Sequence, residues 1–126
     1  NKNKKKKIVP KFIKENLQNH YLDTYDVALV TLAIERKFLI NMGLNFNPEF
    51  NIIGDFDLLM RAACNENVSI INKPLAIYRI HNENFTSKNF DLLVYELNSW
   101  LNNNNQVHKL TNIDKFRQKI LIKTRN

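Results

Sequence analysis

The residues best suited to chemistry lie in one short segment, Gly54-Asp55-Phe56-Asp57, which is followed by Arg61. A carboxylate at the start of a helix stabilises the exposed backbone N–H groups there, so Asp55 has a structural explanation as a helix cap. At the mouth of a site, the same carboxylate can accept a proton as a general base. Asp57 and Arg61 are four residues apart, and on a helix such a pair stabilises by about 0.2 to 0.5 kcal/mol. We therefore predict a cap or base at Asp55, supported by Asp57 and Arg61.

A second segment of interest is Tyr78-Arg79-Ile80-His81. His81 lies where an apolar stretch gives way to a polar loop, and a neutral imidazole at the end of a strand can bind a metal ion. An exposed surface histidine explains the same position equally well. Arg79 is suited to phosphate charge, although packing or a carboxylate partner is an equal alternative. Cys64 is predicted to be a small core residue, and a single cysteine excludes an intrachain disulfide and a cysteine-rich zinc site.

Hydrophobic patterns predict the elements that would position these residues. The continuous apolar run at 27–34 predicts a buried strand, and 68–71 and 75–80 predict two more strands separated by Pro74. The segment 8–19 is predicted to begin extended and to become helical after Pro10. Helices are also predicted at 35–42, closed by Gly43, at 55–63, from Thr86 or Ser87 to 101, and at 112–123. Short strands mixed with helices predict an α/β or α+β arrangement.

The chain has 126 residues, which corresponds to one domain or to part of one. Its two glycines are too few for a P-loop or a dinucleotide-binding loop. No apolar run approaches the roughly 18 residues of a membrane span, and we expect no signal peptide. The visible strands are too few to cover the predicted central strand at 27–34, and the chain begins at Asn1. We therefore expect it to be part of a longer protein.

The net charge of +7 comes largely from a cluster of lysines in the first 14 residues. Such a cluster can bind phosphate, nucleic acid or an anionic membrane, although a solvated tail or a protected edge strand explains it as well. No aromatic residue interrupts the lysine run, so base stacking is not expected there. An alternative function is therefore a small basic binding module for nucleic acid or an anionic membrane, and a third is a helical interaction domain formed by the C-terminal segments.

The order of three segments carries a family resemblance. These segments are FNPEFNIIGDFDLLMRAA, VSIINKPLAIYRIH and NENFTSK. Together they resemble the second half of a family 2 glycosyltransferase of the GT-A fold, most closely over residues 26–88. The resemblance implies a partial GT-A-like α/β domain. Residues 1–88 would form its acceptor-side part, with a basic segment at 1–14, and residues 89–126 would form a helical segment that packs on it.

The resemblance also implies roles for individual residues. Asp55 matches the aspartate of the family's Glu-Asp motif, the general base that deprotonates an acceptor hydroxyl for inverting attack on a nucleotide-sugar, and Gly54 replaces the usual glutamate. His81 matches the histidine that helps to hold Mn²⁺ or Mg²⁺ on the donor diphosphate, where the ion acts as a Lewis acid. Asp57, Arg61 and Arg79 are carried over as substrate-binding or supporting residues.

The nucleotide-binding half of the family, with its Asp-x-Asp metal motif, precedes the matched region. Residues 1–25 do not supply it, and the Asp-x-Asp at Asp55–Asp57 matches the acceptor side by context. We therefore expect a portion of an inverting glycosyltransferase that uses a glycan or lipid-linked acceptor in surface polysaccharide synthesis. It would act in the cytoplasm or at the inner face of the membrane, with peripheral contact through residues 1–14, and nucleic acid is the less favoured partner. We expect a divalent metal only with the donor half, and no transferase activity from the 126 residues alone.

Overall fold

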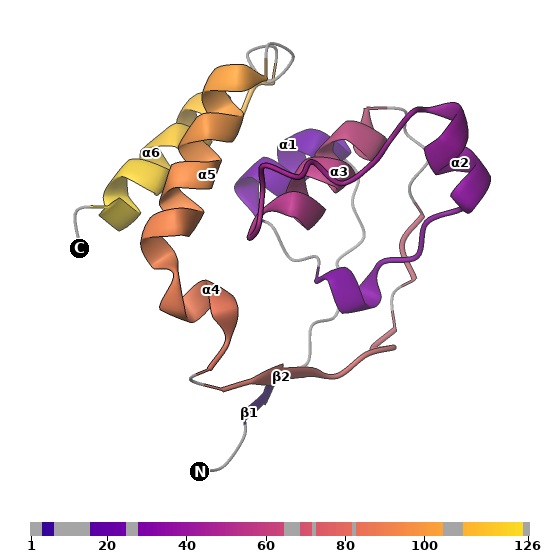
Figure 1. The fold of residues 1–126 in the computed structure, drawn as a ribbon, viewed down its shortest axis with the longest axis horizontal. Helices are drawn as coiled ribbons and strands as arrows, with labels where there is room; N and C mark the ends of the chain where they lie inside the picture. The colour runs from indigo at the N-terminus through magenta and orange to yellow at the C-terminus, as the bar shows by residue number, and fades with distance from the viewer. Residues whose placement is uncertain are drawn as a thin grey trace.

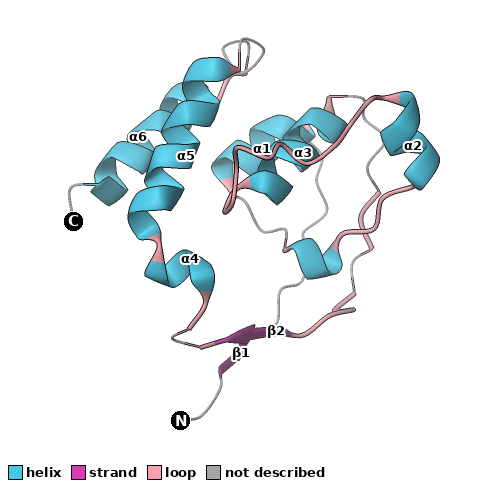
Figure 2. Ribbon diagram, in the orientation of Figure 1, coloured by secondary structure: helices cyan, strands magenta, loops and turns pink. Residues whose placement is uncertain are grey.

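The computed structural model describes residues 4–6, 16–24, 28–64, 69–71, 73–81, 83–104 and 110–124, most of which are helical. Figure 2 shows this predominance of helix over strand. In chain order the elements are β1 (Lys4–Lys6), α1 (Leu17–Asp23), the 3₁₀ helix η1 (Leu29–Thr31), α2 (Arg36–Asn41), α3 (Gly54–Ala63), β2 (Tyr78–Ile80), α4 (Phe85–Lys88), α5 (Phe90–Asn103) and α6 (Ile113–Thr124).

Helix α3 is the central helix, because it buries side chains on two opposite faces. Phe56, Met60 and Ala63 follow helical spacing and face the larger hydrophobic cluster. Leu58 and Ala62 lie one turn apart on the other face and pack with Leu44. Because α3 has neighbours on both sides, it has the environment of a core helix. It therefore fixes the position of the residues in its first turn.

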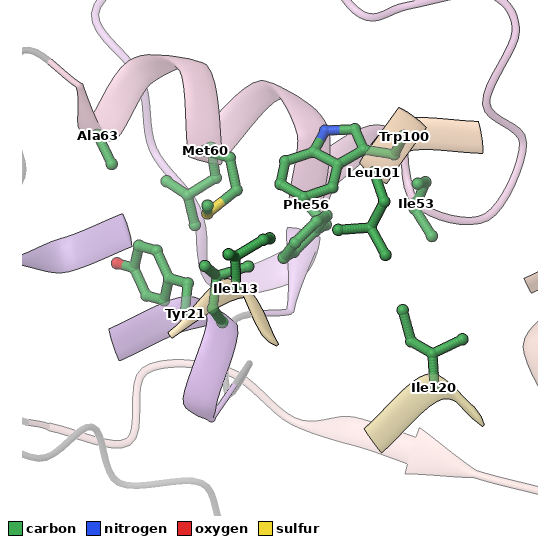
Figure 3. Close-up of a cluster of buried hydrophobic side chains, with 11 residues drawn as sticks. Tyr21, Ile53, Phe56, Met60, Ala63, Trp100, Leu101, Ile113 and Ile120 are labelled. Carbon is green, nitrogen blue, oxygen red and sulfur yellow. The ribbon is translucent and has the colours of Figure 1, made fainter. Parts of the chain in front are cut away.

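The larger cluster joins α3 to α1, α5 and α6. Phe56 packs edge-on against Trp100 of α5, with ring centroids 4.9 Å apart, and stacks with Phe116 of α6 at 5.9 Å. Figure 3 shows the α3 side chains of this cluster among those contributed by the C-terminal helices. The buried members are Tyr21, Leu22, Ile53, Phe56, Leu59, Met60, Ala63, Trp100, Leu101, Ile113 and Ile120.

Helices α5 and α6 lie side by side, and α1 lies beside both α3 and α6 (Figure 1). The Oδ1 of Asn16 caps α1 by accepting N–H bonds from Gln18 and Asn19. At the other end of α1, Asp23 pairs with Lys115 and Lys119 of α6. The N-terminal and C-terminal helices are therefore tied together by polar contacts as well as by the hydrophobic cluster.

The predicted α/β fold of GT-A type is wrong for the residues that the structure describes. The strand pairing there is a single antiparallel ladder of three residues on each side, in which Lys5 is opposite Arg79. A GT-A-like domain requires a sheet covered by helices on its faces. The described part instead buries its apolar surface between helices.

The buried strand predicted at 27–34 is also wrong over its described part. Residues Leu29–Thr31 form η1, in which the N–H and the hydroxyl of Thr31 both bond to the carbonyl of Ala28. Leu29 and Val30 are exposed at 54% and 58%. A strand needs a neighbouring strand to satisfy its backbone groups, and no strand of the described chain pairs with this segment.

More of the predicted helices than of the predicted strands are confirmed. The helices predicted at 35–42, 55–63 and 112–123 are confirmed as α2, α3 and α6, and Gly43 closes α2 with a φ of 60°. The helix predicted from Thr86 or Ser87 to 101 is broken at Asn89, which separates α4 from α5. Of the strand predicted at 75–80, Tyr78–Ile80 forms β2, whereas 69–71 is not a strand and residue 68 lies outside the described part.

Of the segment predicted at 8–19, residues 17–19 lie in α1, as predicted for its helical part, and residues 8–15 lie outside the described part. None of the described helices combines the length and the apolar character needed to cross a lipid bilayer.

Candidate functional site

Asp55 lies in the first turn of α3, where it is half-buried. Its Oδ1 accepts the N–H of Phe56 at 2.7 Å. Burial raises the pKa of the Asp55 carboxyl above its ordinary value, although the N–H bonds of Phe56 and of Asp55 itself oppose that rise. A carboxylate with a raised pKa holds a proton more readily, which is the property required of a general base. Asp55 is not the N-cap residue of α3, which is Ile53, although Asp55 does accept one N–H group of the first turn. The hypothesis that Asp55 is a base is compatible with this position.

The predicted pair of Asp57 and Arg61 is present. Arg61 donates from Nε and Nη2 to Oδ2 of Asp57, at 3.0 and 2.6 Å, and Nη2 also reaches the Asn45 carbonyl at 2.6 Å. Trp100 donates from Nε1 to the other carboxylate oxygen of Asp57 at 3.1 Å. Both oxygens of a 4% exposed carboxylate therefore have donors. The carboxylate of Asp57 therefore bonds within α3 to Arg61 and across to Trp100 of α5.

Glu96 is a polar residue of this region that the sequence analysis missed. It lies on α5, is 1% exposed, and accepts three backbone N–H bonds from the loop before α3. The donors are Asn51 at 2.7 Å, Ile52 at 2.9 Å and Ile53 at 3.1 Å. Burial favours the neutral carboxyl, but these donors outweigh burial and hold the pKa of Glu96 below its ordinary value.

The sequence does contain a signal for Glu96. Leu93, Leu97 and Trp100 mark one apolar face of the helix, and Glu96 falls on that face at three residues from Leu93 and four from Trp100. An acidic side chain is rarely buried without a partner. A lone glutamate on an apolar helical face therefore predicts buried donors, although it does not say which ones.

The structure does not bring the β2 segment to this site. His81 directly follows β2 and is exposed, and Arg79 lies within β2 and is also exposed. The Nδ1 of His81 accepts the N–H of Glu83 at 3.2 Å, and the His81 N–H bonds to the side chain of Asn84. Figure 1 shows β2 well separated from α3. Asp55, Asp57 and Arg61 thus form one group, and Arg79 and His81 form another.

The described residues contain no group of three or more His, Cys, Asp or Glu side chains arranged to hold an ion. His81 alone supplies one ligand, so the divalent metal implied by the resemblance has no complete set of ligands in this part of the chain.

The prediction that Cys64 is a small core residue is wrong, because Cys64 is exposed. It lies just after the end of α3, where its Sγ accepts from Gln18 Nε2 and contacts the carbonyl of Met60.

Comparisons of this chain with protein-family models, with curated proteins and with solved structures find no match. The family resemblance therefore remains a prediction carried by the three sequence segments. The geometry around Asp55 is an independent observation, which does not depend on that resemblance.

Proposed function

We propose that this chain supplies acceptor-side residues of an inverting glycosyltransferase, with Asp55 as the general base. The observation that carries the proposal is the position of Asp55: a half-buried carboxylate with a raised pKa, at the start of a helix that is packed on both faces. A rigid support matters because a base must stay within hydrogen-bond reach of the proton that it abstracts. The three sequence segments indicate sugar transfer from a nucleotide-sugar donor to a glycan or lipid-linked acceptor.

In the proposed reaction, a carboxylate oxygen of Asp55 takes the proton of an acceptor hydroxyl. The hydroxyl oxygen forms a bond to the sugar carbon as the bond from that carbon to the donor diphosphate breaks. In-line attack inverts the configuration at that carbon, and the nucleoside diphosphate leaves with the electron pair of the broken bond. The proposal places donor binding outside these 126 residues and the reaction in the cytoplasm, in surface polysaccharide synthesis.

The test replaces Asp55 by Asn in the natural open reading frame that encodes this chain. We expect sugar transfer to fall by at least about a hundredfold, because general-base catalysis typically contributes 10²- to 10⁴-fold. Donor binding, measured separately by calorimetry, should be unchanged. Asp91→Asn is the matched control, since Asp91 is an exposed aspartate in the first turn of another helix, α5.

Normal transfer by the Asp55→Asn enzyme would refute the assignment of the base. Equal losses in the Asp55→Asn and Asp91→Asn enzymes would show a general effect of charge at helix starts. Turnover of a nucleotide-sugar by the 126-residue chain alone would refute the placement of the donor site elsewhere.

A second candidate function, peripheral contact with an anionic membrane, is favoured by the pairing of β1 with β2. The ladder pairs Lys4–Lys6 with Tyr78–Ile80, so the lysine positions of β1 lie beside the position of Arg79. Basic residues near an anionic surface contribute about 1 kcal/mol each.

Vesicle sedimentation tests this second candidate. Vesicles that contain phosphatidylserine should bind the chain at low salt and release it as salt rises, and neutral vesicles should not bind it. Equal recovery with both vesicle types would remove the membrane function, and preferential capture by duplex DNA would favour nucleic acid instead.

A further inference from the structure

We propose that Glu96 is a positioning residue for Asp55: its buried carboxylate holds the backbone of residues 51–53 and thereby fixes the first turn of α3. This inference rests on the proposed function for its catalytic meaning. The geometry and the experiment that tests it do not require any transfer reaction.

The contact is unusual for its number of donors and for its burial. One carboxylate accepts three successive backbone N–H groups, with Oε1 on Asn51 and Oε2 shared by Ile52 and Ile53. Glu96 is 1% exposed and Ile53 is 3% exposed, so the bond between them is buried, and the bonds to Asn51 and Ile52 are partly buried. Hydrogen bonds to an ionised group are stronger than neutral ones, and a buried group left without its partners is costly.

The held loop leads directly into the first turn of α3. Ile53 is the N-cap residue of α3 and lies two residues before Asp55. Its N–H bonds to Glu96, and its carbonyl accepts the N–H of Asp57 at 2.8 Å. A displacement of Ile53 would therefore move both ends of the turn that contains Asp55.

A second contact from α5 acts on the same turn. Trp100 lies four residues after Glu96, on the same face of α5, and its Nε1 bonds to Asp57. Helix α5 thus holds α3 at residue 53 and at residue 57, on either side of Asp55. Two anchors flanking one residue define the direction of its side chain better than either anchor alone.

The test is an NMR titration of the 126-residue chain with Glu96→Gln. Glutamine keeps the size of the side chain but removes the charge, so one carbonyl oxygen must replace two carboxylate oxygens. We expect the amides of residues 51–53 to exchange with solvent about tenfold faster or more. We also expect the carboxyl carbon of Asp55 to titrate at a pH closer to that of an ordinary aspartate, because a loosened first turn admits water. Glu49→Gln is the matched control, since Glu49 is exposed in the loop that precedes the held residues.

Several outcomes would decide the matter. If Asp55 titrates identically in the wild-type and Glu96→Gln chains while overall stability falls, Glu96 stabilises the fold without positioning Asp55. If Glu49→Gln shifts the titration of Asp55 as much as Glu96→Gln does, the effect is one of charge and the inference is wrong. A result in favour of Glu96 would stand even if Asp55→Asn left sugar transfer intact, so the two proposals fail separately.

The wild-type chain provides a second measurement if Glu96→Gln does not fold. The amide protons of residues 51–53 should shift together with pH and report one titration, that of the Glu96 carboxyl, below the ordinary range of a glutamate. Amide protons that do not follow Glu96 would overturn the inference.

Discussion

The molecule contains two regions of opposite character. Helices α1, α3, α5 and α6 enclose a cluster whose central side chains, such as Trp100, are almost fully buried. The segments at 28–46, 69–71 and 73–81 instead leave several large apolar side chains in contact with solvent, and Ile77 is 71% exposed. The large apolar residues that are exposed in these segments are Leu29, Val30, Ile40, Met42, Phe46, Ile71, Leu75 and Ile77.

The difference shows what each kind of element requires. A helix satisfies its own backbone, so it needs only apolar neighbours to become a stable part of a core. An extended apolar segment also needs a neighbouring strand for its N–H and C=O groups. The first region has the partners that its elements need. Among the described residues, the second has the short ladder between β1 and β2 and the packing of Leu44 against α3.

The largest loss of stability is expected from Trp100→Ala in the packed region. The substitution removes the contacts with Phe56 and Phe116 and the hydrogen bond to Asp57. We expect a loss of about 3 to 5 kcal/mol in the free energy of unfolding, measured by urea denaturation and circular dichroism. Tyr95→Ala, on the same helix but 70% exposed, should change it by less than about 0.5 kcal/mol. Similar losses for the two variants would contradict the contrast between buried and exposed positions.

A smaller loss of stability is expected from Arg61→Met. Asp57 would keep the Trp100 donor but lose both N–H groups of Arg61, and its carboxylate would remain buried. Because Arg61 is itself partly exposed, we expect a cost of about 1 to 3 kcal/mol, measured as above. Arg36→Met, at an exposed position of α2, is the control and should change stability by less than about 0.5 kcal/mol. A stability equal to wild type would show that the pair is not needed.

Asp23→Asn should lower the stability still less, and by an amount that depends on pH. The hydrogen bonds from Lys115 and Lys119 lower the pKa of Asp23 from 3.8 to about 2. Because the pKa in the folded chain is the lower one, the stabilisation is present above about pH 4 and is lost as the pH falls toward 2. The Tm of Asp23→Asn should lie below wild type at pH 6, and the difference should vanish near pH 2. Asp114→Asn, at a highly exposed side chain of α6, should show little difference at either pH.

The smallest effect on stability is expected in the open region. Ile77→Thr replaces a 71% exposed side chain and should leave the free energy of unfolding within about 0.5 kcal/mol of wild type. Self-association, measured by light scattering, should decrease because exposed apolar patches promote it. The same substitution at Ile53, which is 3% exposed, should cost at least about 1 kcal/mol. A large loss at Ile77 would show that the open region is better packed than its exposure indicates.

These two regions also explain which features the sequence predicted. The acidic start of the segment and the spacing of Leu58, Leu59 and Ala62 predict a helix at 55–63 without reference to the rest of the chain. The four-residue spacing of Asp57 and Arg61 predicts their pair. Gly43 marks the end of α2 for a local reason, because its φ of 60° suits glycine. These features, each decided within one or two turns of the chain, were therefore predicted.

Features decided by distant partners were not predicted. The run at 27–34 has the composition of a buried strand, but its structure depends on whether other strands lie beside it. Glu96 bonds to residues more than 40 positions away, and no local pattern names those partners. The separation of Asp55 from His81 likewise depends on the path of the chain between them.

Trp100 has a practical consequence, because it is the only tryptophan in the chain. Its indole lies between Phe56 and the carboxylate of Asp57, at the contact between α3 and α5. Intrinsic fluorescence excited at the red edge of indole absorption therefore reports on the surroundings of Trp100 alone. Any ligand, substitution or change of pH that disturbs the support of Asp55 should alter the emission of a single, known fluorophore, and no label has to be attached.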